Sequence, residues 1–189
     1  MIRKLCNSDE PLISDAIDID KQIQPNGIDL TIGKVELITD EGILDFNNDL
    51  RSLSKTRLLK PTIAIHVSDS CPLPQEVVKL METPHWSLRP GTYLITFNEL
   101  VNIPKNIMAR TLPRSSLMRC GCYTVTAIWD AGYKGRSQAL LVVSNPHGIT
   151  LTVNARIAQM TFEELIYAVS QGYNGIYQNE GVAKCQTSK

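Results

Sequence analysis

The sequence places one isolated carboxylate within a strongly basic stretch. Between residues 100 and 160 the only acidic residue is Asp130, while seven residues are basic. The basic residues are Lys105, Arg110, Arg114, Arg119, Lys134, Arg136 and Arg156. Such a local excess of positive charge suits a small polyanion, and a lone carboxylate in a pocket can activate a water molecule as its general base. The stretch predicts a site for a phosphorylated small molecule, although each basic residue taken alone could equally lie on a solvated strand face.

Arginine and serine side chains are concentrated in the segment PRSSLMR, which begins at Pro113. Two hydroxyls, those of Ser115 and Ser116, lie between Arg114 and Arg119. Guanidinium groups and hydroxyls are donors suited to phosphate oxygens. The segment therefore predicts phosphate contacts, but basic serine-rich turns also occur without a ligand.

Three further segments place polar side chains at expected strand ends. Asp130 lies in WDAGYKG, Asp29 lies in NGIDL, and Arg156 and Gln159 lie in NARIAQM. A carboxylate beside glycines can hold a reacting water, or it can accept backbone hydrogen bonds in a turn. At this point both interpretations stay open for Asp29 and Arg156.

Short apolar segments rich in β-branched residues predict an all-β chain. They cover residues 62–67, 92–97, 123–127, 139–143 and 149–153, with turn residues such as Pro90-Gly91 and Ala131-Gly132 between them. Many short strands at this spacing are typical of an antiparallel sandwich or a distorted barrel.

Helical signals are few. Ser14 and Asp15 could cap a short N-terminal helix that runs through Ile19, before a turn at 25–27. The segment 74–80 fits either one helical turn or a strand.

Two polar segments add little to an expected core. Residues 39–60 form a polar excursion between strands, and the chain from Ser170 onward is polar, with three glycines and two tyrosines. We therefore expect a domain at 1–169 and a tail at 170–189, which is either disordered or orders over a ligand.

Composition narrows the class of protein. The 189 residues have zero net charge and are 43% hydrophobic, which suits one domain and gives no global sign of nucleic-acid binding. There is no apolar run of roughly 18 residues and no signal-peptide pattern, so we expect a cytoplasmic protein without membrane contact. No histidine begins a His-x-Glu motif and no Cys-x-x-Cys occurs, which excludes a zinc-dependent nucleobase deaminase.

Six segments, in this order, resemble the dUTPase and dCTP deaminase superfamily: IQPNGIDL, LRPGTYLITFNE, PRSSLMR, TAIWDAGYKG, ARIAQM and YNGIYQ. The resemblance runs from about Asp15 to Gly181. It implies a distorted, jelly-roll-like β-barrel with a short N-terminal helix and a C-terminal lid tail. It also implies a homotrimer with active sites at the subunit interfaces, and a nucleoside triphosphate bound with Mg²⁺ that the triphosphate mainly holds.

The resemblance assigns roles to individual residues. It implies that Asp130, the expected catalytic residue, binds the catalytic water or the sugar 3′-hydroxyl, depending on the branch. Asp29 is a candidate to support Mg²⁺ indirectly. Substrate binding falls on Arg114, Ser115, Ser116, Arg119, Ala127, Tyr133, Gln159, Tyr173 and Gln178. Among these, the arginines, the serines and Gln159 contact phosphates, while the backbone around Ala127 reads the pyrimidine edge. Tyr133 lies against the deoxyribose and excludes a 2′-hydroxyl, and Tyr173 and Gln178 belong to the lid.

A missing acid separates the two branches of the superfamily. Its deaminases place a glutamate on the strand after the Gly-aromatic-x-Gly turn, where this chain has Leu140 or Val142, and no acid occurs from Ala131 to Phe162. Attack at phosphorus needs only one carboxylate, cationic donors and Mg²⁺. We therefore predict a dUTP diphosphatase that forms dUMP and pyrophosphate. The alternatives are a dCTP deaminase, alone or bifunctional, with a carboxylate delivered from elsewhere, and a non-catalytic nucleotide-binding protein.

Overall fold

Strands dominate the computed structural model, which describes residues 10–63 and 75–182. The helices are α2 (Ile19–Gln22), α3 (Gln75–Glu82) and α4 (Ser115–Arg119). The strands are β1 (Ile13–Ser14), β2 (Ile23–Gln24), β3 (Gly27–Ile38), β4 (Thr56–Leu59), β5 (His85–Leu88), β6 (Gly91–Phe97), β7 (Leu100–Asn102), β8 (Ile107–Pro113), β9 (Cys122–Val125), β10 (Lys134–Gly135), β11 (Gln138–Val143), β12 (Ile149–Thr152) and β13 (Arg156–Glu164).

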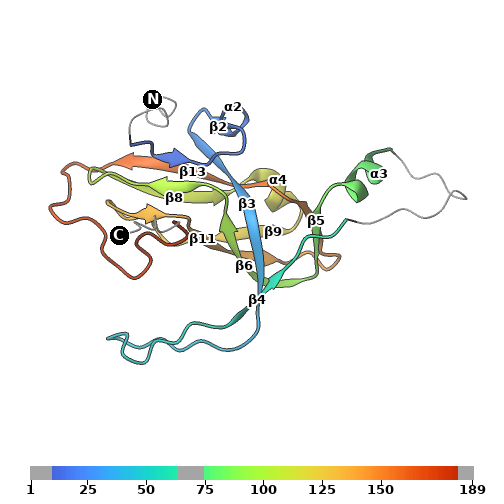
Figure 1. Cartoon of the computed structure of the whole chain (residues 1–189), viewed down its shortest axis with the longest axis horizontal. Coiled ribbons are helices and arrows are strands. Elements are labelled where there is room, and N and C mark those ends of the chain that lie inside the picture. Colours follow the sequence, from blue (N-terminus) through green and yellow to red (C-terminus); the bar gives the residue numbers. More distant parts are fainter. Residues whose placement is uncertain (1–9, 64–74, 183–189) are drawn as a thin grey trace, which may run out of the picture.

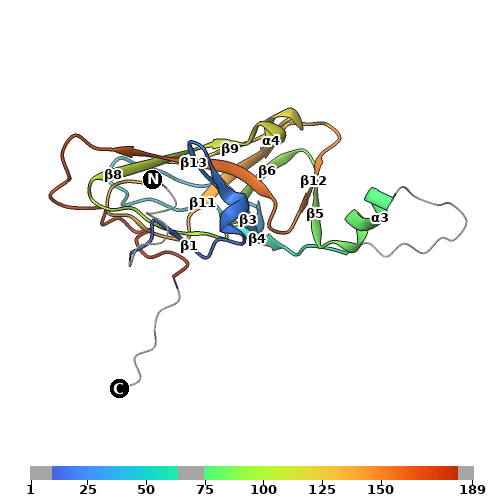
Figure 2. The ribbon, with the colours of Figure 1, turned by 90° about the horizontal axis from the view of Figure 1, so that it is seen from above.

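Six of these strands form a nearly closed antiparallel barrel (Figures 1 and 2). Their order is β8-β13-β3-β6-β11-β9, and β2 and β4 also pair with β3. The chain that follows β9 returns along β8, where Ala109 and Trp129 form a bridge and the hydroxyls of Thr111 and Thr126 lie 3.1 Å apart. This return brings the two edges of the sheet together and confirms the predicted distorted β-barrel.

The long strand β3 lies at the centre of the sheet and is buried on both faces. Ile28, Leu30 and Ile32 point into the apolar core, whereas the alternate residues Asp29 and Thr31 are buried polar groups. Because successive side chains of a strand point to opposite faces, β3 separates the core from a second, polar layer.

The polar layer is organised by Glu99, whose side chain is fully buried. One carboxylate oxygen accepts hydrogen bonds from Gln22 Nε2 at 2.7 Å and Thr31 Oγ1 at 2.6 Å, and the other accepts from the backbone N of Thr31 at 3.0 Å. Burial raises the pKa of this carboxyl, and the hydrogen bonds from Thr31 and Gln22 oppose that shift. Through these bonds Glu99 connects Gln22 of helix α2 to Thr31 of strand β3. Gln22 Nε2 also donates to the backbone O of Asp29 at 2.8 Å.

The N-terminal helix begins later than the sequence indicates. Residues 13 and 14 form the strand β1, and the helix is Ile19–Gln22. Its cap is Asp18, whose side chain accepts a hydrogen bond from the backbone N of Lys21 at 3.1 Å. The expected cap at Ser14 and Asp15 is therefore wrong, because pairing of β1 with β7 takes Ser14 into a sheet and Asp15 follows the strand as a bend.

Several other segments can now be assigned. Residues 75–82 are helical, which settles the ambiguity left by the sequence. The excursion after β3 is an extended arm that ends in β4, with a bridge between Ile43 and Ser52 (Figure 1). Of the strand expected at 62–67, Thr62 pairs with His85, and residues 64–67 lie outside the described residues. None of the helices in the described ranges has the length and apolar character needed to cross a membrane.

The described part of the C-terminal tail packs on the barrel. The backbone N of Tyr173 donates to Ala131 O at 2.8 Å, and the backbone N of Arg136 donates to Glu180 O at 2.8 Å. Tyr173 is partly buried against the apolar core. This tail therefore forms part of the surface that surrounds the site.

We expect Glu99→Ala to lower the free energy of unfolding by roughly 3 kcal/mol, because it leaves buried donors of Gln22 and Thr31 without an acceptor. Glu164→Ala, at an exposed position on β13, is the control and should change it by less than about 0.5 kcal/mol. Urea unfolding followed by circular dichroism measures both. Equal stabilities of the two variants would contradict the role given to Glu99.

Candidate functional site

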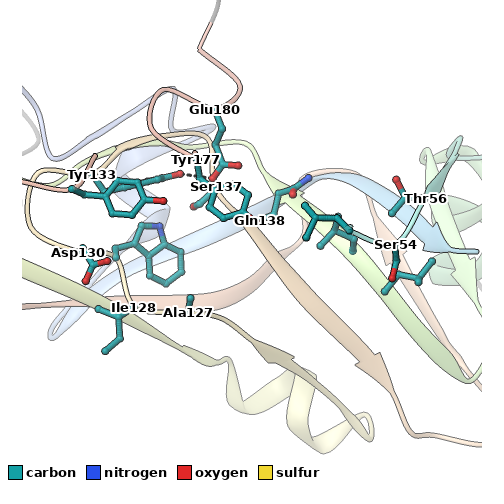
Figure 3. A pocket seen from close by; sticks show the side chains of 15 residues that line it. Ser54, Thr56, Ala127, Ile128, Asp130, Tyr133, Ser137, Gln138, Tyr177 and Glu180 are labelled. Atoms are coloured by element: carbon teal, nitrogen blue, oxygen red, sulfur yellow. Dashed lines mark hydrogen bonds between the residues drawn. The ribbon is translucent and has the colours of Figure 1, made fainter. Parts of the chain in front are cut away.

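A pocket of about 500 Å³ lies between the barrel, the base of the arm and the C-terminal tail (Figure 3). Apolar and polar side chains line it: Ile38, Leu53, Ser54, Thr56, Leu94, Ala127, Ile128, Trp129, Asp130, Tyr133, Ser137, Gln138, Tyr173, Tyr177 and Glu180. Its size and its mixture of aromatic and polar groups suit a small organic ligand.

Asp130 stands at the start of a tight turn that is fixed by backbone hydrogen bonds. The preceding residue, Trp129, exchanges two bonds with Ala109 of β8, at 3.0 and 2.9 Å. Within the turn, Tyr133 N donates to Asp130 O at 3.0 Å, and Gly132 N donates to Ile103 O at 2.9 Å. The Asp130 side chain is exposed. Its carboxylate is therefore presented to the pocket on a rigid backbone.

Position 132 requires a glycine for two reasons: its backbone conformation and the close approach of the tail. Its φ is +90°, in the left-handed region that favours glycine, and a Cβ here would lie 2.6 Å from the Cα of Gly172 in the tail. This close approach allows Tyr173 N to donate to Ala131 O at 2.8 Å. The turn and the tail are thus packed backbone to backbone.

Tyr133 is the side chain that joins the turn to the tail. It is 5% exposed, and its ring meets that of Tyr173 edge-on, with 5.7 Å between centroids. Gln178 bridges the same turn, since its Nε2 donates to Gly132 O at 2.9 Å and its Oε1 accepts from Lys134 N at 2.8 Å. The structure therefore brings Tyr133, Tyr173 and Gln178 together, and Gln178 supports the wall of the pocket rather than lining it.

Glu180 is a pocket residue that sequence reasoning missed. Its Oε1 accepts a hydrogen bond from the Tyr133 hydroxyl at 2.7 Å, and the two side chains lie together in Figure 3. Burial raises the pKa of the Glu180 carboxyl, while the bond from Tyr133 opposes the shift. Burial, followed by the neighbouring Glu180, raises the pKa of Tyr133 well above its usual range, so the phenol stays protonated as the donor. No motif of the sequence signals this contact.

The second group of predicted residues lies around Asp29. Its side chain is 2% exposed, and Oδ2 is 3.0 Å from Arg114 Nε and 3.3 Å from Arg156 Nη1. Burial raises the pKa of Asp29, and the two guanidinium groups oppose this effect. Arg156 also donates to Lys21 O, and Arg114 donates to Arg156 O at 3.3 Å. Asp29 therefore orients two arginines, of which Arg114 is a predicted phosphate ligand.

The remaining predicted phosphate ligands are adjacent to this ion-pair group. Gln159 pairs in register with Asp29 on one side and with Leu112 on the other. After Leu112, the chain turns into α4, which carries Ser115, Ser116 and Arg119 as exposed residues. The fold thus brings the predicted phosphate ligands to one end of β3, β13 and β8.

The two groups do not form one site within a single chain. Ala127, Asp130, Tyr133 and Tyr173 line the pocket, whereas the predicted phosphate ligands do not. Helix α4 and the tail lie toward different ends of the barrel in both views (Figures 1 and 2). The two groups are therefore separated from each other along the molecule.

The described residues offer no preformed cage for a metal ion: within 10–63 and 75–182, no group of three or more His, Cys, Asp or Glu side chains is arranged to hold one. The exposed carboxylate of Asp130 is an oxygen donor of the type that Mg²⁺ takes together with substrate phosphates and water. The donor set fits an ion that arrives with its substrate. Asp29 already pairs with two arginines, so it is oriented toward cations of the protein.

The fold agrees with what comparisons with known proteins show. The dCTP deaminase-like family matches residues 1–165, and the chain belongs to this family. A protein of Methanosarcina mazei named probable deoxyuridine 5′-triphosphate nucleotidohydrolase is 43% identical over 179 residues, which cover 95% of this chain and 94% of that protein. A protein of the same name from Archaeoglobus fulgidus is 40% identical over 182 residues, which cover 96% and 94% of the two chains.

The solved structures support the same fold. The 2′-deoxycytidine 5′-triphosphate deaminase of Agrobacterium tumefaciens superposes with a TM-score of 0.54 at 18% identity, covering 86% of this chain and 46% of that chain. At this identity the likeness concerns the architecture alone. It confirms a barrel of the dCTP deaminase type.

We expect Gly135→Ala to lower the free energy of unfolding by about 1–3 kcal/mol, because a Cβ there would lie 2.6 Å from the Tyr133 hydroxyl and 3.1 Å from Glu180 Cγ. Ser87→Ala, at an exposed position of β5, is the control. Urea unfolding measures the stability, and limited proteolysis measures the release of the tail. If Gly135→Ala matched Ser87→Ala in both measurements, the close contact between turn and tail would be wrong.

Proposed function

We propose that this protein is a cytoplasmic dUTP diphosphatase, which hydrolyses dUTP to dUMP and pyrophosphate. The observation that carries the proposal is the exposed carboxylate of Asp130 on a rigid turn, beside Tyr133 in a pocket of nucleoside size. Membership of the dCTP deaminase-like family, together with archaeal relatives named probable deoxyuridine 5′-triphosphate nucleotidohydrolase, supports the substrate.

In the proposed reaction, Asp130 accepts a proton from the attacking water as the oxygen forms a bond to the α-phosphorus. The bond between this phosphorus and the bridging oxygen breaks, and pyrophosphate leaves. Mg²⁺ would be held mainly by the triphosphate, and when bound it would supply positive charge that offsets the charge developing on the leaving oxygens. Arg114, Ser115, Ser116, Arg119 and Gln159 hold the phosphate chain. Asp29 acts on the phosphates through Arg114, which it orients.

The proposed active site is shared between subunits of a homotrimer. One chain supplies the pocket with Asp130, Ala127 and Tyr133, and a neighbouring chain supplies α4 with its serines and arginine. The separation of these two groups within one chain supports this arrangement. Exposed apolar residues near α4 and β9, namely Leu112, Met118, Tyr123, Val125 and Ile128, are suited to a subunit contact.

The tail at 170–189 is proposed to close the site as a lid, with Tyr173 and Gln178 at its base. Residues 172–180 already touch the turn that carries Asp130. Ile176 stands where deaminases of the superfamily have a lysine, and it is 60% exposed. Any contact of this tail with phosphate would therefore come from other residues.

A dCTP deaminase is the second candidate, because Glu180 delivers to the pocket a carboxylate that the strand at 135–145 lacks. The hydrogen bond from Tyr133 engages one oxygen of this carboxylate, Oε1, and the other oxygen keeps its acceptor capacity. Deamination at C4 requires a carboxylate free to accept a proton from water and pass it to the ring.

With Mg²⁺ present, we expect release of pyrophosphate from dUTP, no ammonia from dCTP, and little turnover of UTP. Tyr133 against the sugar excludes the 2′-hydroxyl, and Leu140 or Val142 cannot transfer protons. Incubation with each nucleotide followed by chromatography separates the possible products. Uridine nucleotides formed from dCTP would establish the deaminase instead, and tight dUTP binding without any product would establish a non-catalytic binding protein.

Asp130→Asn should reduce kcat for dUTP by about 100-fold or more while leaving dUTP affinity within a few-fold, because a carboxamide cannot accept the proton of water. Asp49→Asn, at an exposed position of the arm, is the matched control and should keep full activity. Pyrophosphate release and calorimetric binding of a non-hydrolysable dUTP analogue measure the two quantities. Near-normal turnover by Asp130→Asn would remove Asp130 from the mechanism.

A further inference from the structure

The hydrogen bond between Tyr133 and Glu180 joins residues that are far apart in the sequence, inside the pocket. Tyr133 is a residue of the barrel turn, and Glu180 comes from the tail. Both side chains line the same space. The carboxylate accepts the phenol hydrogen bond at 2.7 Å, and the ring makes an edge contact with that of Tyr173, with 5.7 Å between the centroids. The tail therefore contacts the ring at two points.

Backbone contacts fix the tail independently of this side-chain bond. Asn179 N donates to Lys134 O at 2.7 Å, and Arg136 N donates to Glu180 O at 2.8 Å. These backbone bonds hold the tail alongside β10. The Glu180 side chain is consequently not needed to dock its own segment. Its contact with Tyr133 acts on the orientation of the tyrosine.

The residues around Glu180 leave room for its hydrogen bond with Tyr133. A Cβ at Gly135 would fill the space in which the phenol and Glu180 meet. The nearby guanidinium of Arg136 is instead paired with Asp15, at 2.5 Å. Among the described contacts of the Glu180 carboxylate, the Tyr133 hydroxyl is thus the partner that the structure shows.

We propose that Glu180 is a positioning residue for sugar selection: it holds the Tyr133 ring in the orientation that admits deoxyribose and excludes ribose. This inference rests on the proposed function, in which Tyr133 lies against the sugar. A ring held both at its hydroxyl, by Glu180, and by its contact with Tyr173 cannot swing aside for a 2′-hydroxyl. Without Glu180, the hydroxyl end of the ring would be released into a pocket of about 500 Å³.

The test is a double-mutant cycle of Glu180→Ala and Tyr133→Phe, with kcat and KM measured for dUTP and UTP. Glu180→Ala should lower the preference for dUTP over UTP by about tenfold, mainly through a lower KM for UTP, with kcat for dUTP within a few-fold. Tyr133→Phe should show a similar loss, and the double variant no further loss. Glu180→Gln should restore the preference, because its carboxamide oxygen still accepts the phenol hydrogen bond.

Three results would overturn the inference: an unchanged preference in Glu180→Ala, additive effects of the two substitutions, or an equal rise in turnover of both nucleotides, which would show that the tail blocks the pocket. Calorimetric binding of dUMP and UMP to the same variants tests selection without catalysis. If wild type binds dUMP selectively and Glu180→Ala loses that selectivity while dUTP is not hydrolysed, only the proposed function fails. If wild type binds neither nucleotide, both fail.

Discussion

The turn from Trp129 to Tyr133 is fixed by backbone hydrogen bonds on three sides, and the geometry of the pocket depends on it. Trp129 pairs with β8, Gly132 and Tyr133 bond to Ile103, and Ala131 accepts a bond from Tyr173 in the tail. An exposed carboxylate would otherwise sample many positions, but here only the side-chain torsions of Asp130 remain free. A general base works best when it is held at the reacting atoms, which is the condition this turn provides.

A second constraint lies beneath the proposed phosphate ligands, where Asp29 is buried. A buried carboxylate is costly unless it is paired, and here two guanidinium groups and the neighbouring Glu99 network surround β3 at this point. The arrangement fixes Arg114 at the beginning of α4. Because the pocket lies elsewhere on the same barrel, a single chain contains two well-ordered halves that do not meet. This separation is the physical reason for proposing an assembly in which neighbouring chains complete each other's sites.

The sequence is a good guide where local pattern decides the structure. The β-branched segments at 92–97 and 139–143 predict strands that the barrel contains, and the segment WDAGYKG predicts a turn that carries both Asp130 and Tyr133. The predicted start of the first helix is wrong, because Ser14 pairs with β7 as part of strand β1 and does not cap a helix. No local pattern places Glu180 in the pocket, because it lies in the tail, outside the acid-free stretch from Ala131 to Phe162, and only the fold brings it to the pocket. The placement of α4 relative to the pocket depends on barrel closure, which no local pattern encodes.

The central claim is that two halves from different chains make one active site, and mixed assemblies test it most directly. Asp130→Asn and Arg119→Ala, each inactive alone on this account, are co-expressed with different affinity tags, and complexes that carry both tags are isolated. Pyrophosphate release from dUTP should reappear in these complexes, because some interfaces combine an intact Asp130 with an intact Arg119. Mixed complexes that stay as inactive as either variant alone would contradict the shared site.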